Sequence, residues 1–333
     1  MGAKRKSVPA GAAVAVVITA AMTAGLYACS GPAPAPQPSP RASTPQSPPA
    51  QGISPFTGLA AKPAPVLAVK IDNVPPARPH TGLGAADIVY VEQVEAGQTR
   101  LLAIYSSQTP RTVGPVRSAR ESDLELLRQF GRPALAYSGE QSALRPLINA
   151  APLFALTPGD VPRAYFRGQD RPAPHNLYVR PERALAAVPK ADKAKDIGFR
   201  FGAAPVGGKQ VNEHTVRYPA ARFTFTWSDT DKRWLVAIDG TPARTTDDGR
   251  AAARTVVVQN VDVRPSRFRD RGGNVTPYTE TVGSGTALVL RDGRSHEARW
   301  SRPAADRGTT FTTPAGQPLT FAPGQVWIVL KGR

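Results

Sequence analysis

The residues best suited to bind an anion lie in the segment VGPVRSARE, residues 113–121. Ser118 is followed three residues later by Glu121, the pattern of a capping box, which predicts that a helix begins at Ser118. Arg117 and Arg120 would then lie at a helix N-terminus, where the helix dipole already places about half a positive charge. Two cations there need an anion, and a ligand carboxylate, phosphate or sulfate could bind both the guanidinium groups and the free backbone N–H groups.

Two alternatives to this ligand site stay open. The anion could be internal, since Asp72, Glu92 or Glu95 could fold over and pair with the arginines, and buried arginines are usually paired whether or not they bind a ligand. A second capping box, Ser122 with Glu125, would start the helix later and weaken the argument from the dipole.

Other polar residues are expected to line the same cleft. Arg100 would hold the anion together with the two other arginines. Asp72 and Asn73 directly follow a predicted strand, and ligand sites in α/β sheets tend to lie at the carboxyl ends of strands. The alternative is that these two residues cap a turn. His175 and Asn176 lie in a proline-stiffened loop, where a histidine could be a general acid or base, a ligand, or a surface group.

Several kinds of chemistry are not expected. Cys29 is the only cysteine, and its acylation would leave no thiol for catalysis, zinc fingers or iron–sulfur clusters. The four histidines show no metal-binding spacing, and no nucleotide or nucleophile-elbow motif is present. We therefore expect no metal and no cofactor. Glu92 and Glu95 do not resemble a glycosidase pair, because an odd separation points them to opposite faces of a regular strand.

The order of the strands and helices expected from the sequence predicts an α+β protein. Up to residue 196, strands and helices alternate, which is typical of an α/β-type domain with a mixed sheet. From residue 197 onward, period-two apolar runs separated by Gly, Pro and Asp predict a mostly antiparallel β domain. Asp292-Gly293 between two such runs predicts a two-residue hairpin. In the first domain we expect strands at 66–71, 88–94, 101–105, 134–137 and 177–179, and helices at 118–130, 143–151 and 181–188.

The N-terminus has the pattern of a lipoprotein signal peptide. Basic residues at positions 4–6 precede an apolar run, 14–26, which ends just before Cys29. We predict a signal peptide at 1–28, a Pro-rich tether at 29–54, a first domain at 55–196 and a second at 197–333. A lipidated Cys29 would hold the protein on the outer face of the cell membrane. The alternatives are an uncleaved membrane anchor at 10–28 and a soluble product of ordinary cleavage.

The charge favours anionic partners. The chain has 42 Lys and Arg against 25 Asp and Glu, a formal net charge of +17. No basic–aromatic interleaving follows the leader, so we do not expect nucleic acid as a partner. For an exported protein, anionic lipid headgroups or wall polymers are the more plausible partners. A general compositional bias towards arginine is the alternative.

The chain resembles the YerB-like family of bacterial lipoproteins, whose two parts are domains of unknown function. The resemblance implies an exported, membrane-anchored protein of two domains and implies no reaction. In two places the sequence departs from the pattern: His80 stands where a glutamine is expected, and 240–250 lacks an expected histidine and aspartate arrangement. The resemblance covers about 56–330 and is carried by residues 70–73, 77–79, 82–83, 86–90, 99–100, 113–120, 137–139, 173–178, 260, 283–285, 323–324 and 327.

Three hypotheses for the function follow. The first is an envelope lipoprotein that binds an anionic wall fragment or polymer through Arg100, Arg117, Ser118 and Arg120. The second is a hydrolase of wall material with Asp72 or His175 as the base. The third is a non-catalytic scaffold that contacts other envelope proteins. The sequence favours binding over catalysis and does not identify a ligand or a protein partner.

Overall fold

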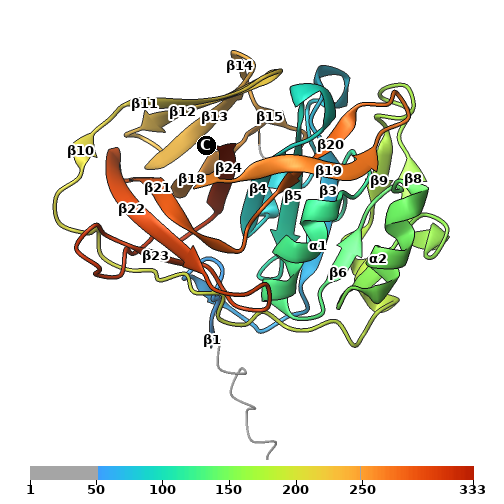
Figure 1. Cartoon of the computed structure of the whole chain (residues 1–333), viewed down its shortest axis with the longest axis horizontal. Helices are drawn as coiled ribbons and strands as arrows, with labels where there is room; N and C mark the ends of the chain where they lie inside the picture. Colours follow the sequence, from blue (N-terminus) through green and yellow to red (C-terminus); the bar gives the residue numbers. More distant parts are fainter. Residues whose placement is uncertain (1–51, 248) are drawn as a thin grey trace, which may run out of the picture. The chain divides into compact units, whose positions relative to one another are not determined.

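An 11-stranded sheet runs through residues 52–247 and 249–333, the part of the chain that this computed structural model describes (Figure 1). Its strand order is β10-β22-β21-β18-β24-β4-β5-β3-β6-β7, and β23 pairs with β22. The strands are β3 (Leu67–Asp72), β4 (Ile88–Gln93), β5 (Thr99–Tyr105), β6 (Ala134–Ala136), β7 (Phe154–Leu156), β10 (Lys209–Gln210), β18 (Thr255–Val261), β21 (Gly283–Arg291), β22 (Arg294–Arg302), β23 (Thr310–Thr312) and β24 (Val326–Gly332).

Apolar, β-branched runs form the middle of this sheet. All six residues of β3 are buried, and β18 buries Val256, Val257 and Val258 in succession. A strand that is covered on both faces requires such a continuous apolar run. The pairs β3–β6, β6–β7, β18–β24 and β24–β4 are parallel and the other pairs of the sheet are antiparallel. This mixed sheet, with a chiefly antiparallel C-terminal part, confirms the predicted α+β class.

A second, five-stranded sheet packs on one face of the large sheet. Its strands are β11 (Glu213–Tyr218), β12 (Ala221–Ser228), β13 (Arg233–Ile238), β14 (Thr241–Pro242) and β17 (Ala252–Ala253). Alternate residues of β12 point inward, so that Phe223 and Phe225 contact Trp327 of β24 with ring centroids 6.5 and 6.1 Å apart. The predicted period-two alternation is therefore confirmed in these strands. Short pairs complete the β structure: β1 (Gly52–Ile53) with β2 (Ala60–Ala61), β8 (Tyr165–Arg167) with β9 (Leu177–Val179), β15 (Arg244–Thr245) with β16 (Gly249–Arg250), and β19 (Val263–Arg269) with β20 (Val275–Thr279).

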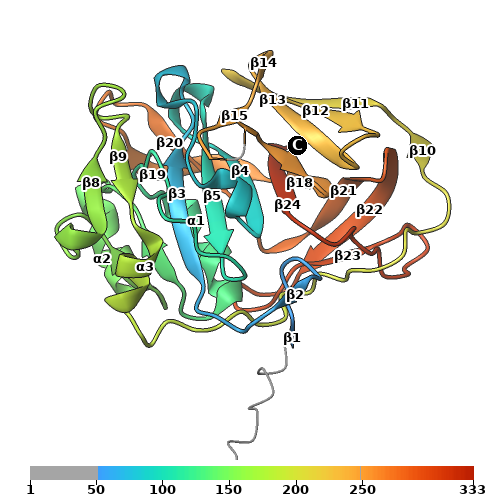
Figure 2. The same cartoon turned by 180° about the vertical axis from the view of Figure 1, so that it is seen from behind.

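The helices are short. Leu126 and Leu127 of α1 and Ile148 of α2 belong to the apolar cluster on the opposite face from the second sheet, whereas Ala184 of α3 belongs to the same cluster as that sheet. Figure 2 shows α3 from behind, close to β8 and β9. The helices are α1 (Glu121–Leu127), α2 (Arg145–Ala150) and α3 (Pro181–Ala186), and the 3-10 turns are η1 (Pro75–Ala77), η2 (Leu83–Ala85), η3 (Glu95–Gly97), η4 (Arg128–Phe130), η5 (Ser142–Leu144) and η6 (Pro162–Ala164).

The strand β24 lies in the centre of the sheet, although it is the last strand of the chain. It pairs in parallel with β18 on one side and with β4 on the other. The sheet is thus continuous across residues 196 and 197, where a domain boundary is predicted from the sequence. Arg302 of β22 reinforces this continuity, because its buried guanidinium donates to the carbonyls of Glu125 and Leu126 in α1.

The hairpin between β21 and β22 confirms the turn predicted from the sequence. Asp292 and Gly293 connect the two strands with φ values of 50° and 71°. Two successive residues with positive φ are the requirement of a type I′ turn, which explains why aspartate and glycine occupy these positions.

The predicted signal peptide, Cys29 and nearly all of the predicted tether lie outside the described residues. Within residues 52–247 and 249–333, no helix has the length and apolar character needed to cross a membrane.

Candidate functional site

The predicted helix start at Ser118 is wrong. Helix α1 begins at Glu121, and Arg120 is the N-cap residue, whose N–H donates to the carboxylate of Asp123 at 2.6 Å. The preceding segment is held in an extended conformation, because the N–H of Arg117 donates to the Lys70 carbonyl of β3. Ser118 therefore does not lie at a helix N-terminus, and an anion in this region would be bound by the side chains.

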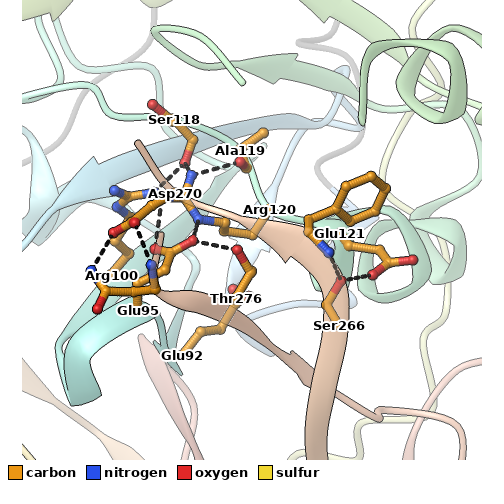
Figure 3. A network of polar contacts seen from close by, with 12 residues as sticks. Glu92, Glu95, Arg100, Ser118, Ala119, Arg120, Glu121, Ser266, Asp270 and Thr276 are labelled. Atoms are coloured by element: carbon orange, nitrogen blue, oxygen red, sulfur yellow. Dashed lines mark hydrogen bonds and ion pairs between the residues drawn. The ribbon is translucent and has the colours of Figure 1, made fainter. Parts of the chain in front are cut away.

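The arginines that the sequence singled out nevertheless line one cleft of about 1200 Å³. The cleft lies between loops of the N-terminal part and the β19–β20 hairpin, and Figure 3 shows part of its polar lining. Seven arginines and four carboxylates line it, a surplus of three positive charges. The arginines are Arg100, Arg117, Arg120, Arg145, Arg167, Arg269 and Arg271, and the acids are Glu95, Glu121, Glu140 and Asp270.

Arg120 is paired within the protein. Its Nε lies 2.6 Å from Oε1 of Glu95, and Thr276 of β20 donates to the same carboxylate at 2.6 Å (Figure 3). Burial alone would raise the pKa of Glu95, but the hydrogen bonds and charge of Arg120, with the bond from Thr276, outweigh burial and lower the pKa to about 2. The alternative of internal pairing therefore describes Arg120.

Asp72 joins two of the other candidate residues. Its Oδ2 lies 3.2 Å from Nε of Arg117 and 2.9 Å from Nδ1 of His175. The Asp72 side chain is only 3% exposed, whereas Arg117 and His175 remain 28% and 19% exposed. Nε2 of the buried His80 donates to the carbonyl of Asp72 at 2.8 Å. Both the side chain and the backbone of Asp72, the last residue of β3, are therefore held by polar contacts.

Arg100 has no carboxylate partner among the described residues. Its Nη1 donates to the carbonyl of Ser118 at 2.9 Å, and no acidic group of that part of the chain lies within ion-pair distance. Burial, and then the charge of Arg120, lower the pKa of Arg100 to about 9, although Glu95 and Asp72 oppose the shift. Four arginines of the cleft pair with no carboxylate of the described residues, and Arg100 is the half-buried one, whereas Arg167, Arg269 and Arg271 are exposed.

The side chains of two predicted site residues, Asn73 and Asn176, form hydrogen bonds within the protein. Asn73 donates to the hydroxyl of Thr99 at 2.8 Å. Asn176 donates to the carbonyl of Gly168 and accepts a hydrogen bond from Arg167, each at 2.8 Å. The four residues expected to line the cleft beside the arginines are therefore absent from its lining: Asp72, Asn73, His175 and Asn176.

A buried charge cluster beneath the cleft was not predicted. Nζ of Lys70 lies 2.5 Å from Glu92 and 2.6 Å from Asp123, and all three residues are almost inaccessible to solvent. Burial raises the pKa of Glu92, and the charge of Lys70 only partly opposes this shift. The available signal was a lysine in the middle of the apolar run of β3.

The contribution of the C-terminal part to the cleft was also missed. Arg269, Asp270 and Arg271 reach the cleft from the turn of the β19–β20 hairpin. The signal for them was the alternation of arginines before Gly272 and Gly273 in the sequence SRFRDRGGN. Within the described residues, no three His, Cys, Asp or Glu side chains gather as a metal site would require.

Comparison with family models assigns the chain to a class. Residues 56–195 match the N-terminal domain, and residues 214–328 the C-terminal domain, of a protein of unknown function, DUF3048. Together these matches cover most of the chain, which therefore belongs to this two-part family.

Two comparisons with individual proteins agree with this assignment. The chain is similar to the protein named "Putative lipoprotein YerB" from Bacillus subtilis (strain 168), with 29% identity over 276 residues, covering 79% of this chain and 80% of the relative. It is also similar to the crystal structure of YerB from Bacillus subtilis, with a TM-score of 0.70 and 23% identity, covering 83% of this chain and 95% of the solved one. The YerB-like resemblance and the fold are thus confirmed.

Proposed function

We propose that this protein is an envelope lipoprotein whose cleft binds an anionic ligand, such as a wall fragment or polymer. The similarity to a protein named as a lipoprotein supports the predicted lipid anchor at Cys29. The anchor would place the cleft outside the cell membrane, where anionic polymers occur. Mass spectrometry of the mature chain tests the anchor, and an acylated Cys29 is the expected result.

The unpaired guanidinium of Arg100 carries the proposal. A partly buried cation without a carboxylate is costly, and a bound anion removes that cost. Arg117 and Arg120 lie in the same cleft, and each of them pairs with one carboxylate, that of Asp72 or of Glu95. A guanidinium offers paired N–H groups that match a carboxylate or a phosphate, so the ligand class is an oxyanion.

Replacing Arg100 by glutamine is expected to weaken anion binding about 10–100-fold, because a hydrogen bond to a charged group contributes about 1.5–3 kcal/mol. The binding of full-length protein to a purified phosphate-rich wall polymer can be measured by isothermal titration calorimetry. The affinity is expected to fall as the salt concentration rises.

Arg111→Gln is the matched control, since Arg111 is exposed and lies outside the cleft while the change in net charge is the same. This control should bind the polymer as the wild-type protein does. Equal losses in the two variants would mean that only the net charge attracts the polymer, and would contradict a site at Arg100.

The contact between Asp72 and His175 supports a second candidate, a hydrolase of wall material. A carboxylate at 2.9 Å from Nδ1 can fix the orientation of an imidazole, leaving Nε2 to act as a general base. In this case His175→Gln should reduce the release of soluble fragments from purified wall by at least about 100-fold, the lower end of the usual contribution of general-base catalysis. Binding without any release by the wild-type protein would reject the hydrolase and leave the binding function.

A further inference from the structure

The strand β11 leaves one edge of the second sheet free. It pairs with β12 and, among the described residues, with no other strand. The N–H of Trp227 donates to the carbonyl of Asn212 at 2.8 Å, which makes these two residues a hydrogen-bonded pair at the end of the ladder.

This pair fixes the direction of every peptide group along β11. Hydrogen-bonded and non-hydrogen-bonded pairs alternate in an antiparallel ladder, so the peptide groups of His214 and Val216 bond to β12. The N–H and C=O groups of Glu213, Thr215 and Arg217 therefore point away from β12, towards the free edge.

A cavity of about 630 Å³ lies against this edge. It is lined by four consecutive residues of β11, His214–Arg217, and since alternate residues of a strand face opposite sides, the cavity meets the edge of the strand and not one face. The opposite wall comes from the large sheet, with Val258 of β18 and Leu288 of β21. β11 and β22 lie on opposite sides of this region in both views (Figures 1 and 2).

The cavity carries positive charge without internal partners. Its lining includes Arg217, Arg299 and Lys331, and none of the three forms an ion pair with a carboxylate of the described residues. Among the described residues, Glu297 is the single acidic residue of the lining. Arg217 also lies directly opposite Arg222 in the ladder, a like-charge pair that destabilises the strands.

We propose that β11 receives an extended, acidic peptide segment of a partner protein as an additional strand. The outward peptide groups of Glu213, Thr215 and Arg217 would supply the backbone hydrogen bonds, as in other complexes formed by strand addition. The side chains of Arg217, Arg299 and Lys331 would select carboxylates. This site is separate from the Arg100 cleft and does not depend on its function.

A second copy of the chain is a less suitable occupant. The chain carries a formal net charge of +17, and pairing two copies would bring the unpaired cations of the cavity close together. An acidic peptide neutralises the same groups.

A fluorescein-labelled octapeptide that alternates threonine with glutamate tests the proposal by fluorescence anisotropy on the full-length protein. Thr215→Pro should weaken its binding at least tenfold, because proline removes an N–H that points away from β12 and leaves the β11–β12 ladder intact. Thr215→Val is the matched control: it keeps the N–H, and both variants lose the hydroxyl contact of Thr215 with Thr224. The valine variant should bind as the wild type does.

Two further arms separate strand addition from other outcomes. The same peptide with alternate backbone nitrogens methylated should not bind, and unchanged binding would overturn the proposal in favour of charge attraction alone. Arg100→Gln should leave peptide binding unchanged, and a loss would assign the peptide to the other cleft. The proposal is also overturned if the octapeptide does not bind, or if light scattering shows a dimer that Thr215→Pro abolishes.

Discussion

Replacing Lys70 by methionine is expected to lower the free energy of unfolding by about 3–5 kcal/mol, the usual cost of removing one partner from a buried ion pair. The change leaves the carboxylates of Glu92 and Asp123 buried and adjacent without the ammonium group that lies 2.5 and 2.6 Å from them. Neither solvent nor a second cation replaces it, because all three side chains are almost fully buried. Urea unfolding at pH 7 measures the loss.

A double variant separates charge from packing. Lys70→Met with Glu92→Met removes one carboxylate together with the lysine, and leaves Asp123 with the N–H of Arg120. It should recover a large part of the stability, since hydrophobic replacement of a buried ion pair is often neutral. Lys62→Met, at an exposed position, should change stability by no more than about 0.5 kcal/mol. If Lys70→Met behaves like Lys62→Met, the buried charge cluster does not exist in solution.

The second large effect is a loss of stability in acid that depends on His80. Burial, with a smaller contribution from the charge of Arg78, lowers the pKa of His80 from 6.5 to about 4, against the opposing hydrogen bond to the Asp72 carbonyl. Between these two values the unfolded chain binds a proton that the folded protein does not. The contribution of His80 to stability is therefore complete above pH 6.5 and is lost as the pH falls towards 4, by about 2 kcal/mol at pH 5.

His80→Gln tests this effect, because a glutamine amide can still donate to the Asp72 carbonyl but does not titrate. The difference in unfolding free energy, wild type minus variant, should fall by about 2 kcal/mol between pH 7 and pH 5. The raised pKa of Glu92 acts in the opposite direction, lowering stability as pH rises, but it is common to both proteins and cancels in the difference. A difference that does not change with pH would contradict a buried, neutral His80.

The strands were predictable because their sequences carry a strong local signal. Residues 66–71 and 88–94 are apolar and β-branched, and the structure forms β3 and β4 there within one residue at each end. The residues around Trp234 alternate in burial as the period-two pattern requires. In these segments local preference and burial agree, so the sequence alone is sufficient.

The start of α1 was not predictable from local pattern. Ser118 and Glu121 satisfy the spacing of a capping box, but hydrogen bonds with distant residues keep residues 116–119 extended. One of them joins the N–H of Ala119 to the carbonyl of Gly139. Such contacts depend on the topology of the sheet, which no local pattern contains.

The candidate site was predictable in part for the same reason. Arg100, Arg117 and Arg120 were identified from charge and spacing, and the structure places them in one cleft. The hairpin that brings Arg269 and Arg271 to the same cleft lies almost 150 residues further along the chain. Its position depends on how the two parts of the chain share one sheet.

The central position of β24 has a consequence for how the chain matures. Val326 pairs with Ile88, 238 positions earlier, so this ladder has a very large sequence separation. Chains with such non-local pairings fold slowly, because the entropy of closing the loop is lost before the contacts form. Before β24 is synthesised, one edge of the apolar strand β4 has no partner and can pair with other nascent chains. We therefore expect correct folding of this protein to require that the open edge of β4 is protected until β24 pairs with it.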